Sequence, residues 1–159
     1  MKRFIVLSIV LLMLAGFAIT SSAEVVTLFA DQDVDVGTLT VERIGDNLIV
    51  TYAITAPWVV GETHLYVGDS APTKSAPGQF PYGPEDVVDN KVVYTIPLVD
   101  LGAVVGDILV IAAQAEVTHS TEIDPDTDEL REETAWAFGE DKIRPGKNWA
   151  MYFSFTVTE

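Results

Sequence analysis

The chain has 159 residues and no cysteine, and its 24 acidic residues against 9 Lys and Arg give a net charge of −15. Nucleic acids and anionic membrane surfaces are bound through basic patches, so this charge argues against both classes of partner. The lack of cysteine excludes disulfides, thiol catalysis and Cys-based zinc sites. Core packing must therefore stabilise the fold, with a bound metal ion as the other available source of stability.

Residues 1–23 have the parts of a secretory signal peptide. Lys2 and Arg3 precede an apolar run over residues 4–18, and Ser-Ser-Ala at residues 21–23 matches a cleavage site. The run is shorter than the roughly 20 residues of a spanning helix, which favours cleavage over an uncleaved anchor. Cleavage leaves residues 24–159 as a single domain with 7 basic and 24 acidic residues, a net charge of −17. The sequence thus predicts a secreted protein, at the cell surface, in the periplasm or released, that does not contact a membrane after cleavage.

The mature sequence has the pattern of short strands joined by turns. Residues 36–43 and 48–55 alternate apolar and polar side chains around a Gly-Asp-Asn turn, which predicts a hairpin. Further strands are expected at residues 63–68, 92–97 and 149–158, where β-branched and aromatic residues are frequent. Residues 101–117 are apolar enough to resemble a membrane helix, but Leu109 to Val117 alternate with a period of two, which favours a central strand. We therefore predict an all-β fold, an antiparallel β-sandwich of about seven to nine strands.

Three longer connections separate these strands. Residues 70–91 are rich in proline and glycine, residues 119–133 are acidic, and residues 139–148 are mildly basic. Within the acidic connection, Asp124, Asp126 and Asp128 alternate as carboxylates do in a Ca²⁺ loop. The EF-hand glycine is missing there, and also from a second run at Asp31, Asp33 and Asp35, so a solvated acidic loop is the competing interpretation.

The two histidines, His64 and His119, are the obvious candidates for general base chemistry. His64 stands two residues after Glu62 on a predicted strand, and this pair is the one base that we could nominate for a hydrolase. The chain contains neither a Gly-x-Ser-x-Gly elbow nor a His-Glu-x-x-His helix. No catalytic residue is therefore assigned, and the chain is predicted not to be an enzyme.

Aromatic residues gather in and beside the predicted loops. Such rings, with amide or carboxylate side chains nearby, are how many β-domains stack on sugars, although the same rings also serve to pin loops to a sheet. Tyr82, Trp136 and Asn148 are the predicted contact residues, with His64 as a further candidate ligand-binding residue. Trp149 belongs to the core-facing set of its predicted strand and is expected to pack.

Four sequence blocks carry a resemblance to a group of uncharacterised extracellular domains in secreted and surface proteins of prokaryotes. The blocks are residues 62–68 (ETHLYVG), 77–82 (PGQFPY), 133–137 (ETAWA) and 146–153 (GKNWAMYF). The resemblance covers nearly the whole mature chain and implies an exported module that often stands beside other surface domains, without an established activity. Gln114 stands where the resemblance implies a histidine, so a metal site shared by that histidine and His64 is not expected here.

Three hypotheses follow from the sequence. The first is a secreted, non-enzymatic binding or adhesion module that recognises a carbohydrate or a surface protein through loops at one end. The second is a structural component of the cell envelope that is stabilised by Ca²⁺, the one possible cofactor. The third is a hydrolase that uses His64 and Glu62.

Overall fold

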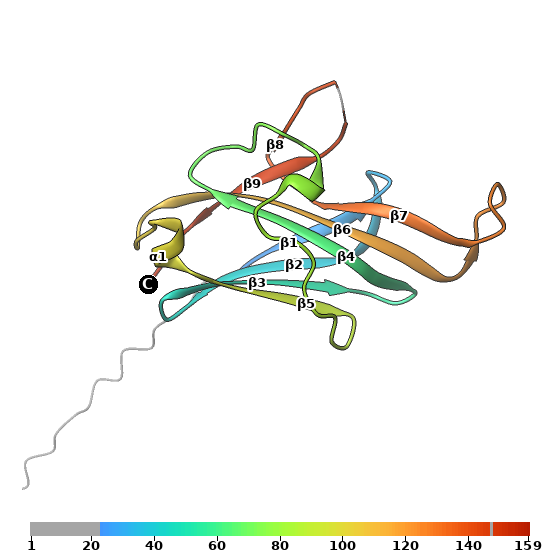
Figure 1. The fold of residues 1–159 in the computed structure, drawn as a ribbon, viewed down its shortest axis with the longest axis horizontal. Helices are drawn as coiled ribbons and strands as arrows, with labels where there is room; N and C mark the ends of the chain where they lie inside the picture. Colours follow the sequence, from blue (N-terminus) through green and yellow to red (C-terminus); the bar gives the residue numbers. More distant parts are fainter. Residues whose placement is uncertain (1–22, 147) are drawn as a thin grey trace, which may run out of the picture.

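The computed structural model describes residues 23–146 and 148–159, and this part of the chain is almost entirely β-structure (Figure 1). The signal-peptide prediction for residues 1–23 lies outside the described residues, apart from Ala23. Two short helical turns, η1 (Pro77–Gln79) and α1 (Leu98–Leu101), interrupt the connections. The strands are β1 (Glu24–Ala30), β2 (Val34–Ile44), β3 (Asn47–Ile54), β4 (Trp58–Gly68), β5 (Lys91–Pro97), β6 (Ile108–Ile123), β7 (Leu130–Ala137), β8 (Asp141–Lys142) and β9 (Met151–Thr156). The predicted all-β fold is confirmed.

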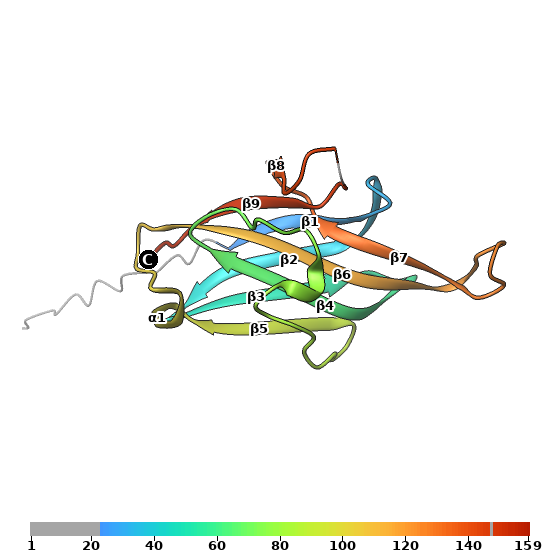
Figure 2. The ribbon, with the colours of Figure 1, turned by 45° about the horizontal axis from the view of Figure 1, so that its top comes forward.

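All the strand pairs are antiparallel, and they connect the strands in the order β5-β3-β2-β1-β7-β6-β9-β8, with β4 paired to β6. Strands β3 and β5 also meet β4 through side chains, because the hydroxyls of Tyr52 and Tyr94 donate hydrogen bonds to the backbone oxygens of His64 and Thr63 at 3.0 and 3.1 Å. Figure 2 shows β4 and β6 in front of β2 and β3. The ladders form one connected sheet, so the division into the two layers of a sandwich stays a prediction.

Strand β6 explains how the core is arranged. Its odd-numbered residues from Leu109 to Val117 are all buried in the main core, as their period of two predicts. Ala112 and Gln114 point to the opposite face of the strand and are buried as well. A strand in a sheet with one solvated face exposes such positions, so this burial shows that something covers the outer face of β6. The two long loops supply this cover: the connection between β4 and β5 and the connection between β8 and β9.

Strands β6 and β7 extend beyond the rest of the sheet as a projecting arm, residues 119–133 (Figure 1). The sequence was expected to form an irregular acidic connection here, whereas the strands reach Ile123 and resume at Leu130, which pair across the arm. Arg131 supports the base of the arm: its guanidinium lies 5.5 Å from the centre of the Trp58 ring and forms ion pairs with Glu122 and Glu133 at 3.2 and 3.0 Å. Cross-strand pairs and a cation–π contact thus extend the hairpin despite its acidity.

Within residues 23–146 and 148–159, no helix combines the length and the hydropathy that crossing a bilayer requires.

Candidate functional site

The outer face of β6 carries a small aromatic core that is separate from the main one. Two connections meet over it: the segment between β4 and β5 brings Phe80, and the segment between β8 and β9 brings Ala150. Outside this core, the side-chain amide nitrogen of Asn148 donates a hydrogen bond to the hydroxyl oxygen of Ser75 at 2.9 Å and joins the two loops. We call the set the aromatic cluster; its buried members are Phe80, Ala112, Trp136 and Ala150, and Tyr66, Ile143, Trp149 and Tyr152 pack against them.

Trp136, a predicted contact residue, lies inside this cluster and is only 4% exposed. It pairs with Gln114 on one side and Phe29 on the other, and the Phe80 ring meets it edge-on with centroids 6.1 Å apart. A ring covered by a loop cannot offer its face to a ligand. In this structure Trp136 holds the loops on the sheet, the packing role that competed with binding at the sequence level.

Tyr82 and Asn148 belong to different connections, between β4 and β5 and between β8 and β9. Tyr82 forms backbone hydrogen bonds with Leu65 in both directions, at 2.9 and 3.2 Å, along the free edge of β4, and its half-buried ring packs against the main core. Burial, reinforced by the negative charge of Asp100, raises the pKa of its hydroxyl. Asn148 is exposed and lies on the loop-covered face. Trp136 and Asn148 thus lie on the loop-covered face, Trp136 buried and Asn148 exposed, whereas the Tyr82 ring packs against the main core.

His64 pairs directly with Gln114 across β4 and β6, and its Nδ1 lies 2.9 Å from the side-chain oxygen of Gln114. An amide oxygen can only accept, so Nδ1 carries the proton. Gln114 is 2% exposed, and this bond satisfies its buried oxygen. Gln114, which stands where the resemblance implies a histidine, is thus a direct partner of His64. Glu62 is exposed and adjoins the register shift between Val60 and Thr63.

The two aspartate runs form turns. The Asp124 carboxylate accepts a hydrogen bond from the Asp126 backbone at 2.8 Å, and the backbone nitrogen of Asp128 donates to the Asp124 carbonyl at 3.0 Å. The Asp35 carboxylate similarly accepts from the backbone of Gly37 at 3.0 Å. In the described part of the chain, no three or more histidine, aspartate or glutamate residues are grouped so that they could hold a metal ion.

An open groove of about 220 Å³ lies where the β1–β2 turn meets the segment that follows β7. We call it the aromatic groove; its lining residues are Phe29, Gln32, Phe138, Lys142, Trp149 and Met151. The Phe29 and Phe138 rings meet edge to face with centroids 5.8 Å apart, and Phe138 is 56% exposed. Gly139 lies directly against the backbone of Tyr152, where any Cβ would collide, so this glycine permits the tight approach to β9.

Sequence reasoning overlooked this groove for an identifiable reason. Phe138 directly precedes one of the predicted connections, but Phe29 comes from a strand that the sequence pattern did not predict, more than 100 residues away. The signal that could have revealed this strand was the β-branched and aromatic content of residues 24–30 (EVVTLFA). In the structure Leu28 and Ala30 are fully buried and Phe29 is half-buried.

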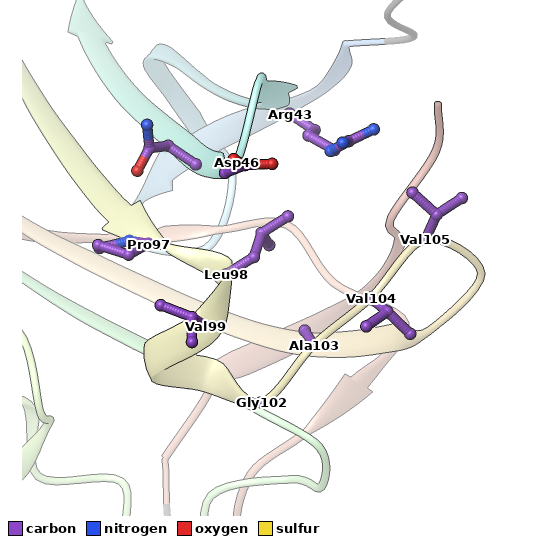
Figure 3. Close-up of a pocket in the computed structure, with 10 residues that line it drawn as sticks. Arg43, Asp46, Pro97, Leu98, Val99, Gly102, Ala103, Val104 and Val105 are labelled. Carbon is purple, nitrogen blue, oxygen red and sulfur yellow. The ribbon is translucent and has the colours of Figure 1, made fainter.

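Further hollows lie elsewhere. One of about 350 Å³ lies at β5 and the segment before it. Two larger ones differ in chemistry. One, of about 510 Å³, lies over β4, β6 and β7, and its acidic lining residues are Glu62, Glu116, Glu132 and Glu133. The other, of about 650 Å³, is largely apolar and lies between the β2–β3 turn, α1 and the segment that follows it (Figure 3). Leu98 and Ala103 line its buried side, while Val99 and Val104 are exposed around it.

Comparisons of the chain with protein-family models, with curated proteins and with solved structures found no match.

Proposed function

We propose that the protein is an exported, non-enzymatic recognition module that binds a carbohydrate or a surface protein with the face covered by its two long loops. The observation that carries the proposal is the convergence of these loops on one face of β6, where they pack on the aromatic cluster and leave the Phe138 ring exposed beside it. Loops held by a rigid sheet are where binding residues concentrate. The excess of negative charge is consistent with the exclusion of nucleic acid and anionic membranes.

The other hypotheses have weaker support. The contacts of His64 are those of a structural residue, since its ring binds the Gln114 side chain and its carbonyl accepts the Tyr52 hydroxyl. The carboxylate of Asp124 is engaged by its own turn, so no observation favours the Ca²⁺-stabilised envelope component over the recognition module.

The proposal is tested by exposing the immobilised mature chain to polysaccharide and protein fractions of cell envelopes. We expect one fraction to be retained, and to be retained less when Asn148→Ala loosens the link between the loops. Ile44→Ala is the matched control, because Ile44 is an exposed residue at the end of β2, and two strands separate β2 from β6 in the sheet order. Absence of retention, or equal retention by both variants, would contradict the proposal.

A further inference from the structure

We infer that the aromatic groove binds one neutral sugar ring of a carbohydrate chain. The inference rests on the recognition function proposed above, and it names the class of ligand and the residues that hold it.

The walls of the groove are aromatic and held in place. Trp149 is half-buried because it also packs against the aromatic cluster, and the edge-to-face contact with Phe29 orients Phe138. Exposing more than half of a phenylalanine leaves a large apolar area in water, which a ligand can cover. The C–H face of a pyranose ring matches such a flat, rigid surface, since the aromatic face carries partial negative charge.

Two polar side chains stand at the groove in addition to the rings. Gln32 is exposed in the β1–β2 turn, where its backbone adopts a φ of 72°, and Lys142 belongs to β8. An amide both donates and accepts hydrogen bonds, and an ammonium group donates three. Sugar hydroxyls both donate and accept, so they can pair with both side chains. An apolar side chain of a protein partner would leave these groups without partners.

The charge of the groove selects a neutral ligand. Lys142 pairs with Met151 and Asp141 pairs with Tyr152, so Lys142 and Asp141 point to opposite faces of the β8–β9 ribbon. The carboxylate of Asp141 lies 3.5 Å from the Tyr152 hydroxyl and is not among the groove's lining residues. Of the six side chains that line the groove, Lys142 is the ionisable one. Lys142 repels a cationic ligand at short range, and the net charge of −17 of the mature chain repels an acidic polysaccharide at long range.

The size of the groove sets the number of sugar rings. A volume of about 220 Å³ is below the range of roughly 300–1,000 Å³ that is typical of pockets for drug-sized ligands. One ring fits such a space, and because the groove is open, the rest of the carbohydrate chain can continue into solvent.

The test is titration of the mature protein with neutral hexasaccharides (of glucose, xylose, mannose and N-acetylglucosamine) and with hexagalacturonate as the acidic probe. Binding is followed by nuclear magnetic resonance shifts and by tryptophan fluorescence. We expect at least one neutral hexasaccharide to bind and to shift the resonances of Phe138 and Lys142. Stronger binding of hexagalacturonate than of every neutral probe would overturn the inference.

Three substitutions at Phe138 separate stacking from simple apolar contact. Phe138→Ala and Phe138→Leu should both weaken binding by about tenfold, because leucine retains apolar area but not the ring, whereas Phe138→Tyr should bind like the parent chain. Since Phe138 is exposed, we expect these variants to fold, and circular dichroism melts verify it. Lys142→Met should weaken binding severalfold, with Lys91→Met in β5 as its control.

The outcomes distinguish failure of this inference from failure of the proposed function. Equal affinity of Phe138→Ala and the parent chain would overturn the inference, as would binding of no neutral hexasaccharide. If an envelope protein is retained and Phe138→Ala abolishes its retention, the groove belongs to a protein partner; the inference then fails while the recognition function stands. If no envelope fraction and no hexasaccharide bind, both fail.

Discussion

At the scale of single residues, Trp136 shows how a side chain that looks functional in sequence acquires a structural role. Its ring fills the space between β6 and the loop that carries Phe80, so it contacts both the sheet and its cover. Removing a buried tryptophan side chain leaves a cavity whose lining loses its contacts. The residue therefore contributes to binding only through the loops that it holds.

We predict that Trp136→Ala lowers the free energy of unfolding by about 3–5 kcal/mol, because it removes a nearly fully buried ring. Urea denaturation followed by far-ultraviolet circular dichroism measures this loss. Phe138→Ala is the matched control: it also removes an aromatic ring, two residues further along the chain, but an exposed one, and should cost less than about 1 kcal/mol. A loss at Trp136 no larger than that at Phe138 would contradict the assignment of Trp136 to packing.

At the scale of the elements, the projecting arm depends on a few contacts at its base. Isolated two-stranded ribbons are marginally stable in water, so the arm needs the support of Arg131 against Trp58 and the two glutamates. The arginine is only partly exposed, and a cation–π contact of this kind contributes about 0.5–1 kcal/mol.

We predict that Arg131→Met increases amide hydrogen exchange in residues 120–133 while the free energy of global unfolding falls by about 1 kcal/mol or less. Methionine retains the apolar stem over Trp58 but loses the charge, so the change isolates the electrostatic contribution. Exchange measured by mass spectrometry reports the arm separately from the rest of the sheet. Arg144→Met, on the loop between β8 and β9, serves as control; faster exchange throughout the sheet would show that Arg131 supports more than the arm.

The elements also show how far the sequence could be interpreted. Residues with a strict period of two, such as those of β6, were assigned correctly because one face must be buried. Strand β7 was missed because Arg131, Glu132 and Glu133 give its first half the composition of an acidic loop. Asn90 was missed as well: its side chain donates to the carbonyls of Ile54 and Trp58 and accepts from the amide of Val60, partners at least 30 positions away along the chain. Contacts of this range leave no local pattern.

The difference between local patterns and long-range contacts also explains which candidate site residues the sequence could identify. Tyr82, Trp136 and Asn148 were chosen for residue type near loops, and composition cannot tell a covered ring from an exposed one. The aromatic groove depends on Phe29 and Phe138 meeting at the point where β1 joins β7, which only the strand order establishes.

At the scale of the whole molecule, the excess of acidic residues makes its stability depend on ionic strength. Like charges repel in the compact state, and salt screens this repulsion. A divalent cation therefore stabilises the mature protein by screening, whether or not a specific site binds it.

We predict that millimolar Ca²⁺ raises the melting temperature by the same amount as MgCl₂ of equal ionic strength, because no grouping of acidic side chains able to hold a metal ion is present within the described residues. A specific site would add about 2.7 kcal/mol at a hundredfold excess over its Kd. Differential scanning calorimetry compares the two salts on the parent chain and on the triple variant Asp124→Asn, Asp126→Asn, Asp128→Asn. A Ca²⁺-specific increase that the triple variant loses would restore the structural hypothesis.

The buried hydroxyls of Tyr52 and Tyr94 make the stability of the protein sensitive to alkaline pH. Burial raises the pKa of Tyr52, which Tyr94 raises further, and burial also raises the pKa of Tyr94. Both groups keep their protons in the folded state at a pH where the unfolded chain, with a tyrosine pKa of about 10, loses them. Their contribution to stability is therefore complete below pH 10 and decreases as the pH rises above that value, since the unfolded state then binds fewer protons than the native state.

We predict that the free energy of unfolding, measured by urea denaturation between pH 9 and 11.5, falls above pH 10 and falls less steeply in Tyr52→Phe. At neutral pH this variant loses about 1 kcal/mol, because it gives up the hydrogen bond to the His64 carbonyl. Its stability curve should therefore approach that of the parent chain as the pH rises. Tyr152→Phe, which removes a half-buried hydroxyl near Asp141, is the matched control for the loss of a tyrosine hydroxyl. Parallel curves for the parent chain and Tyr52→Phe would show that the link between β3 and β4 does not control the alkaline limit.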